Sequence, residues 1–356
     1  MKATLKRTLA LLLASASLFA MAACSKSGAP SVSSNPSAQT GQPSNQSSGE
    51  KIVWRVGHTN AEDHYWNVYM EKFGELVAEK SGGRIEVQVY PNSQLGDDAA
   101  MGEMIRNGNL DMMVTAACIP GKWYRPMAMM EMAGLFQDMD HVERFVYGDE
   151  NSVQVMKDGC AEAGILLWDN WMRTGFEFMT TKPVSQLSDF NGLKVRVTPD
   201  EVWVKHMEGT YGLSSSPIAF SAVFTSLQQG VCEGVLNPIS SMYTMRFHEV
   251  CDNLVIAGSN YDFAPILVSP KSWDALDKEL QDIMWECELE IREEVKEYIK
   301  TEDQTYMDLM KAENPDLVIT YLDKDEVSAS AKKIHQEVVD LVGGQELYDA
   351  IQACAE

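Results

Sequence analysis

The stretch KIVWRVGHT, residues 51–59, alternates apolar and polar side chains with the period of two that is typical of a half-buried β-strand. A helical pattern follows over residues 63–83 and ends at a pair of glycines, which is a common way for a helix to stop. RIEVQVYP, residues 84–91, alternates again. After a helix expected over residues 99–107, the apolar run LDMMVTAA, residues 110–117, predicts a third strand. This succession of strands and helices predicts an α/β fold with a largely parallel sheet.

Strands and helices continue to alternate in the second half of the chain. Apolar or alternating runs predict strands at AGILLWDN, residues 163–170, at LKVRV, residues 193–197, and at VCEGVLNP, residues 231–238. A helix is expected over residues 201–212, where it ends at a glycine. Roughly 300 residues follow the N-terminal region, and a chain of that size usually divides into two lobes.

A long helix is expected toward the C-terminus. No glycine or proline occurs from Trp273 to Lys311, and apolar side chains recur there every three or four residues. The pattern predicts one helix over about residues 273–311, roughly 58 Å long at 1.5 Å per residue. The alternative is a pair of helices that break near Glu302 and Asp303.

The N-terminus has the parts of a secretory signal peptide. A short basic head precedes the apolar segment TLALLLASASLFAMAA, residues 8–23, which is too short for an ordinary membrane span. The next residue, Cys24, resembles the lipidated cysteine of a bacterial lipobox; the alternative is a plain secretory cut beside an unrelated cysteine. Residues 25–50 contain almost no large apolar side chain and cannot form a core. We therefore expect a signal peptide at 1–23 and a lipidated, disordered tether at 24–50, on a protein outside the cytoplasm.

The net charge of −23 argues against two classes of partner. So acidic a chain repels nucleic acid and anionic lipid headgroups, so we expect contact with a membrane through the lipid anchor alone. Six further cysteines lack CxxC spacing, which gives no support for a metal or redox site and leaves their disulfide pairing open. They are Cys118, Cys160, Cys232, Cys251, Cys287 and Cys354. Motifs for a serine nucleophile, a phosphate loop or a dinucleotide are absent from the sequence, so neither an enzyme nor a cofactor is expected.

The stretch FNGLKVRVTP, residues 190–199, sets a cation on a strand expected deep in the fold. Apolar residues alternate there with Lys194 and Arg196. A guanidinium in such a place predicts a ligand with a carboxylate, because the rest of the chain supplies mainly negative charge. The alternative is a surface strand with a hydrated outer face.

Three blocks carry a family pattern in combination. They are KFGELVAEKSGGRIEVQVYPNSQLGDDAAMGEMIRNGNLDMMV at residues 72–114, DFNGLKVRV at residues 189–197 and FSAVFTSLQQGVCEGVLNPISSM at residues 220–242. In this order they resemble the solute-binding proteins of TRAP transporters, of the DctP type, and the resemblance covers nearly all of residues 52–340.

The resemblance implies an α/β, two-lobed periplasmic-binding-protein-like fold with a ligand cleft between the lobes and a long helix bridging both. We expect lobe I over residues 51–172, partly completed by the return segment 260–356, and lobe II over residues 173–259. It also implies that the protein closes around a small organic acid, a dicarboxylate or a sugar acid. The acid is then delivered to an ion-gradient-driven permease with a small and a large membrane subunit.

The same resemblance assigns ligand-binding roles to particular positions. Arg196 matches the family arginine that grips the ligand carboxylate, a role that suits the planar fork of donors on a guanidinium. Asn237 matches an asparagine of the same cleft, and Asn60 lies in a loop that often contacts the ligand. Arg173 is the candidate for a second arginine of the site.

Three further residues are expected near the cleft, each with an alternative. Asp97 and Asp98 either bind ligand hydroxyls at the cleft mouth or are solvated loop acids. Trp171, with Trp168 nearby, either stacks on the ligand or belongs to the core.

Two other classes of function remain open from the sequence. One is a binding protein of ABC-transporter type, or a sensor partner for an organic acid. The other is an extracytoplasmic lyase or hydrolase of sugar acids. The long uninterrupted helix and the YPNSQLG block favour the TRAP class, and the ligand is not identified by the sequence.

Overall fold

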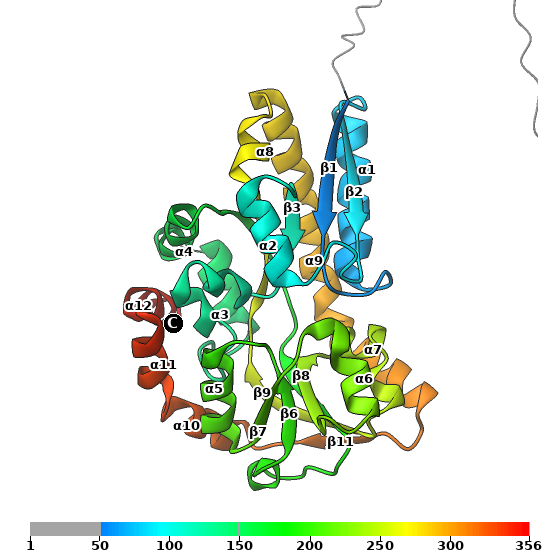
Figure 1. Ribbon diagram of the computed structural model, residues 1–356, viewed down its shortest axis with the longest axis vertical. Helices are drawn as coiled ribbons and strands as arrows, with labels where there is room; N and C mark the ends of the chain where they lie inside the picture. Colours follow the sequence, from blue (N-terminus) through cyan, green and yellow to red (C-terminus); the bar gives the residue numbers. More distant parts are fainter. Residues whose placement is uncertain (1–50, 149, 356) are drawn as a thin grey trace, which may run out of the picture. The chain divides into compact units, whose positions relative to one another are not determined.

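Two β-sheets organise the residues that the computed structural model describes, 51–148 and 150–355 (Figure 1). The strands of the first sheet are β1 (Ile52–Gly57), β2 (Ile85–Tyr90), β3 (Met112–Val114), β4 (Leu166–Met172) and β10 (Phe263–Val268). The strands of the second sheet are β5 (Phe176–Thr180), β6 (Lys194–Val197), β7 (Ser214–Pro217), β8 (Gly234–Pro238), β9 (Asn253–Asn260) and β11 (Val318–Tyr321). Their orders in space are β2-β1-β3-β10-β4 and β11-β9-β5-β8-β6-β7. We call the first sheet with its helices lobe I and the second lobe II. The predicted α/β class with two lobes is confirmed.

Helices surround both sheets. In the described part of the chain the α-helices are α1 (Tyr65–Lys80), α2 (Asp98–Asn107), α3 (Met139–Glu143), α4 (Glu150–Glu162), α5 (Glu201–Tyr211), α6 (Val223–Gln228), α7 (Ile239–Thr244), α8 (Pro270–Asp274), α9 (Lys278–Glu313), α10 (Lys324–Lys332), α11 (His335–Val342) and α12 (Gln345–Ala353).

The first part of lobe I follows the predicted alternation. β1 pairs in parallel with both β2 and β3, and α1 and α2 make the connections. α1 is followed by Gly82 and Gly83, whose φ angles of 62° and 79° are easily adopted by glycine. α2 begins after Asp97, whose carboxylate accepts a hydrogen bond from the amide of Ala100 at 2.9 Å. Local signals therefore determine these connections.

Two strand connections carry the chain from one sheet to the other. β4 leaves lobe I and β5 enters lobe II after residues 173–175, while β9 leaves lobe II and β10 enters lobe I after residues 261–262. β4 is antiparallel to β10, and β5 is antiparallel to β9. The two crossings therefore lie side by side, and they form the strand part of a hinge between the lobes.

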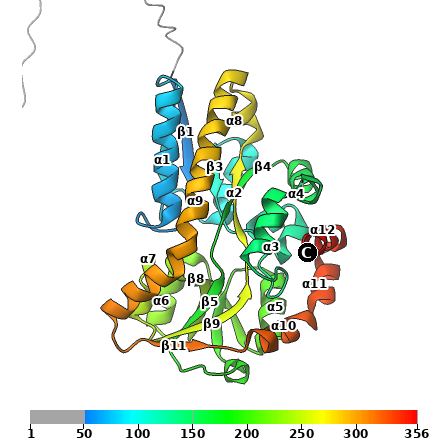
Figure 2. The ribbon, with the colours of Figure 1, turned by 180° about the vertical axis from the view of Figure 1, so that it is seen from behind.

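The long helix α9 is a third connection between the lobes. It runs unbroken through Glu302 and Asp303, and both views show it extending along lobe I and into lobe II (Figures 1 and 2). Its 36 residues begin at Lys278, five residues later than expected, because α8 is a separate helix. The side chain of Asp277 caps the new start by accepting a hydrogen bond from the amide of Leu280.

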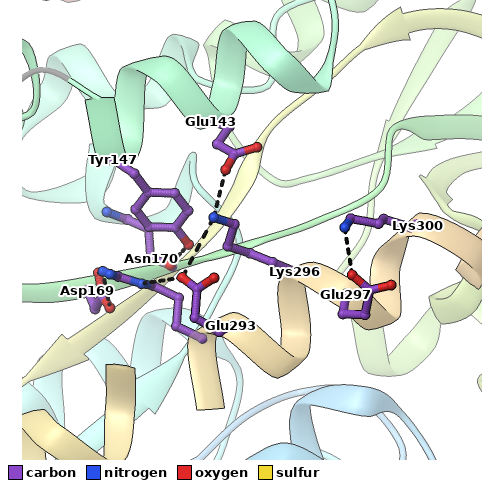
Figure 3. Close-up of polar contacts among 9 residues, drawn as sticks. Glu143, Tyr147, Asp169, Asn170, Glu293, Lys296, Glu297 and Lys300 are labelled. Atoms are coloured by element: carbon purple, nitrogen blue, oxygen red, sulfur yellow. Dashed lines mark hydrogen bonds and ion pairs between the residues drawn. The ribbon is translucent and has the colours of Figure 1, made fainter. Parts of the chain in front are cut away.

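Polar contacts attach the middle of α9 to lobe I (Figure 3). Lys296 pairs with Glu143 of α3 at 2.7 Å, and Arg292 pairs with Asp169 of β4 at 3.3 Å. Both cations also lie near the ring of Tyr147, at 5.4 and 4.6 Å from its centroid. These contacts hold this part of α9 on lobe I.

The C-terminal helices also touch both lobes. α10 and α11 pack against α5, and α12 packs against α4 (Figure 2). His206 of α5 accepts a hydrogen bond from the amide of Ala133 at 2.8 Å, and His335 of α11 bonds the carbonyl of the same residue at 2.8 Å. Burial lowers the pKa of both histidines, which suits a neutral ring.

The six cysteines whose pairing the sequence left open are unpaired in the structure, and all except Cys354 are buried. No helix within residues 51–148 and 150–355 is both long enough and apolar enough to cross a membrane. The predicted signal peptide, Cys24 and the tether lie outside the described residues.

Substitution of Gly121 by alanine is expected to destabilise lobe I. A Cβ atom at this position meets the backbone nitrogen and Cα of Ala128 at 2.3 and 2.5 Å, so the backbone itself must shift. We expect Gly121→Ala to lower the free energy of unfolding by about 2 kcal/mol or more, as measured by urea denaturation.

Gly209→Ala is the matched control, because its Cβ meets only side-chain atoms of Ile334, at 2.9 and 3.0 Å, and no backbone atom, and alanine favours the helix. Equal losses of stability in the two variants contradict this account.

Candidate ligand-binding site

A cavity opens between the lobes at the carboxyl ends of their parallel strands. It encloses about 800 Å³, counted with its open mouth. Lobe I contributes Asn60 after β1 and Asp98 at the start of α2, and lobe II contributes Arg196 from β6 and Asn237 from β8. Ligands of open α/β sheets commonly bind at such strand ends. The cavity brings together six of the seven predicted ligand-binding residues.

Arg196 is a buried cation with free donors. The residue is 5% exposed, and its Nε donates to the carbonyl of Ile218 at 2.8 Å. Within residues 51–148 and 150–355 the terminal nitrogens of Arg196 have neither an ion pair nor a hydrogen bond, and Asp98 is the charge that acts on it most strongly. Burial lowers the pKa of Arg196 to about 10, so the guanidinium stays charged at neutral pH. Its fork of donors is therefore available to an anion in the cavity.

Arg173 also lines the cavity, but its charge is already compensated. Its guanidinium lies 3.1 Å from Asp262 and 3.8 Å from Glu131, and all three residues are buried. It also lies 4.5 Å from the ring centroid of Phe176. Burial alone would lower the pKa of Arg173, but the two acids outweigh it and the pKa is raised. Because Arg173 and Asp262 occupy the two strand crossings, their ion pair joins the two halves of the hinge.

Asn60 and Asn237 face the cavity from opposite lobes with amide groups that are not fully used. They are 3% and 6% exposed, and the Oδ1 atom of each is buried without a hydrogen-bond donor in the described structure. An unsatisfied buried acceptor costs about 1–3 kcal/mol, so both residues are suited to a polar ligand.

Asp97 and Asp98 both line the cavity, but their carboxylates have different neighbours. Asp97 is exposed and caps α2. Asp98 is partly buried, and it accepts a hydrogen bond from the hydroxyl of Thr115 at 2.9 Å. Burial raises the pKa of Asp98, while Thr115 and the nearby Arg196 act in the opposite direction. Asp98 is therefore the better placed of the two to meet a ligand.

Trp171 does not line the cavity. It is fully buried in the core of lobe I, where its indole nitrogen donates to Glu288 at 2.6 Å. The indole at the site belongs to Trp66 of α1, whose Nε1 is buried without a partner in the described structure. Trp66 shares the buried face of α1 with Met70, Phe73 and Val77, so its spacing looks like that of a core residue and no local signal points to it.

The two buried acids that pair with Arg173 have no signal in the sequence. Glu131 and Asp262 lie 42 and 89 residues from Arg173 along the chain and meet it only through the fold. No local pattern distinguishes them in a chain with 52 acidic residues.

A buried acid of α9 lies beside the same hinge. Glu302 accepts a hydrogen bond from the hydroxyl of Thr174 at 3.3 Å, one residue after Arg173. Burial, with the nearby Asp303, raises the pKa of Glu302 to about 8. All three connections between the lobes therefore meet around residues 173–174.

Comparison with known proteins identifies a matching family. The profile of the family described as "Bacterial extracellular solute-binding protein, family 7" (DctP) matches residues 56–340. The sialic acid-binding periplasmic protein SiaP of Vibrio cholerae is 26% identical over 272 residues, 76% of this chain and 83% of that protein. The C4-dicarboxylate-binding periplasmic protein DctP of Rhodobacter capsulatus is 27% identical over 265 residues, 74% and 78% of the two chains.

Solved structures share the fold. A TRAP periplasmic solute-binding protein of Sulfurospirillum deleyianum with bound succinate superposes with a TM-score of 0.79 at 23% identity, covering 85% of this chain and 99% of that one. Another from Roseobacter denitrificans with bound L-galactonate gives a TM-score of 0.76 at 22% identity, covering 86% and 99%.

The contribution of Glu302 to the stability of the protein is expected to fall as pH rises from about 5 to 8. Glu302 holds its proton in the folded state up to about pH 8, whereas an exposed Glu loses it near 4.5. Between these values the folded state binds more protons, so its stability decreases by at most about 1.4 kcal/mol per pH unit from this group. Urea unfolding at pH 5, 6.5 and 8 measures the slope of the free energy of unfolding against pH. Glu302→Gln should remove the part of the decrease that comes from this group.

Glu297→Gln, at an exposed position of the same helix, should keep the wild-type slope. Some slope remains in the Glu302 variant, because burial also raises the pKa of Glu177 to about 8. If Glu302→Gln and the wild type lose stability in parallel, the buried acid is not the source.

Proposed function

Because the chain belongs to family 7 of the bacterial extracellular solute-binding proteins, we propose that it captures a small organic acid and delivers it to a TRAP permease. The permease consists of a small and a large membrane subunit and uses an ion gradient. The binding protein holds its cargo without chemical change, so the proposal includes neither catalysis nor a cofactor. The family match favours this reading over an ABC-type binding protein or a sensor partner.

The observation that carries the proposal is the buried guanidinium of Arg196, which has no ion pair within the described residues. A carboxylate pairs with both terminal nitrogens of an arginine in one plane. Each hydrogen bond to a charged group contributes about 1.5–3 kcal/mol. The chain carries a net charge of −23, so an anion needs a local cation to stay in the cavity.

The positions of the polar groups support a ligand-driven closure. Asn60 and Asp98 belong to lobe I, whereas Arg196 and Asn237 belong to lobe II. A ligand contacts both sets at once only when the lobes are closed. It therefore favours the closed state by the difference between its affinities for the closed and open states.

The ligands named for relatives support an acid as the cargo. Sialic acid, C4-dicarboxylates, succinate, galacturonate and L-galactonate all carry at least one carboxylate. We propose a dicarboxylate or a sugar acid for this protein.

We also propose that the protein is a membrane-anchored lipoprotein outside the cytoplasm. Cleavage after residue 23 makes Cys24 the first residue and its lipid the anchor. A coil of about 26 residues then gives the folded part a mean reach of roughly 28 Å.

Removal of the Arg196 guanidinium is expected to weaken binding without unfolding the protein. We expect Arg196→Ala to lower the affinity for the ligand at least about tenfold, equivalent to about 1.4 kcal/mol, in calorimetric titrations. Lys194→Ala removes an exposed cation from the same strand and should bind as the wild type does. Wild-type affinity in the Arg196 variant refutes the assignment.

Loss of the lipidation site is expected to release the protein from the membrane. Cys24→Ser removes the thiol that carries the lipid, so fractionation should find the variant outside the membrane pellet. Recovery of this variant in the membrane fraction with its signal segment already cut off counts against Cys24 as the anchor.

A further inference from the structure

The cavity has two arginines, but it offers a second anion little positive charge. Arg173 faces two buried acids, Asp262 at 3.1 Å and Glu131 at 3.8 Å, so its single charge is already shared between them. Arg196 has no such partner among the described residues. The third cation of the lining, Lys122, is exposed, and an exposed cation contributes little to holding an anion.

The remaining polar side chains of the cavity include carboxyl groups and unsatisfied amide oxygens, beside hydroxyls that either donate or accept. Asp98 and Glu131 present carboxyl groups, and the Oδ1 atoms of Asn60 and Asn237 are buried without donors. Carboxylate and amide oxygens accept hydrogen bonds from O–H and N–H donors. A hydroxyl that donates to a carboxylate makes a strong, charge-assisted hydrogen bond. A second carboxylate brings acceptors to a place that needs donors.

We infer that the ligand is an acid with a single carboxylate, held by Arg196, and with several hydroxyl groups that donate to Asp98, Asn60 and Asn237. This inference rests on the proposed function and narrows its ligand class to aldonates and uronates, excluding dicarboxylates. Asp98 is the specificity-determining residue, because its negative charge opposes a second carboxylate while its oxygens accept hydroxyl donors.

The apolar part of the lining suits such a ligand. Phe176, Phe220 and Leu236 line the cavity beside the polar groups. The C–H faces of a sugar acid pack on these side chains, while its hydroxyls reach the acceptors. The indole Nε1 of Trp66, buried without a partner in the described structure, offers one donor to an oxygen of the ligand.

Matched pairs of acids test the inference. In each pair the two acids have the same carbon chain and configuration, but the terminal CH₂OH of one is a carboxylate in the other: threonate with tartrate, gluconate with glucarate, and galactonate with galactarate. Galacturonate, succinate and hexanoate complete the panel. Affinities of the wild-type protein are measured by calorimetry after a thermal-shift screen.

We expect the tightest ligand of the panel to be a hydroxylated monocarboxylate. It should bind at least about tenfold tighter than the diacid with the same chain, equivalent to about 1.4 kcal/mol. A diacid as the tightest ligand overturns the inference and leaves the proposed function standing. Hexanoate as the tightest ligand overturns the part played by the hydroxyl donors. A wild-type protein that binds no acid of either kind contradicts the proposed function itself.

Substitution of Asp98 tests the residue that sets the preference. Asp98→Asn keeps the size of the side chain and removes its charge, so the ratio of monocarboxylate to diacid affinity should fall at least about fivefold. Asp349→Asn removes the same charge from an exposed position of α12 and should keep the wild-type ratio. An unchanged ratio in a folded Asp98 variant overturns the role of Asp98. If that variant fails to fold, the wild-type ratios still decide the ligand class.

Discussion

The ion pair between Arg173 and Asp262 is the interaction on which the arrangement of the lobes depends. Each residue occupies one of the two strand crossings, and neither charge is stable in the interior without the other. Glu131 adds a second acid from lobe I. The cluster therefore holds the two crossings together. It also occupies the guanidinium of Arg173, which is then less available to the ligand. Arg173 pairs with buried acids and therefore joins the strand crossings. Arg196 has no such ion pair in the described structure and is therefore the arginine that meets the ligand.

The lobes are joined in a way that suits bending rather than separation. The two strand crossings and α9 pass close together, and Thr174 links the first crossing to Glu302 of α9. Lys296 attaches the preceding turns of α9 to lobe I, as Figure 3 shows. A hinge of this kind keeps each lobe rigid and concentrates any change at a few residues, which allows the cavity to open and close around fixed binding groups.

Electrostatics explains how an acidic protein selects an anion. The general negative field disfavours anions everywhere except where a desolvated cation faces them, and burial makes that one interaction strong. The acceptors around Arg196 narrow the range of ligands further, because they stabilise ligands with hydrogen-bond donors and destabilise ligands with additional negative charge. Selectivity then comes from groups that oppose the wrong ligand as much as from the arginine that attracts the right one.

Local sequence patterns determined the strands and helices of the first half of lobe I, the unbroken run of α9 and the cation of β6, because period, capping and apolar spacing act over a few residues. The resemblance to the family indicated the cavity residues Arg196, Asn237 and Asn60. The sequence did not reveal that β9 pairs with β5, or that Arg173 pairs with Asp262 and Glu131. It also did not reveal that Trp66, and not Trp171, lines the cavity. Glu131 and Asp262 lie 42 and 89 residues from Arg173 along the chain. Tertiary structure alone decided these features, because sheet order and buried charge compensation depend on which distant segments come together, and no local period encodes that.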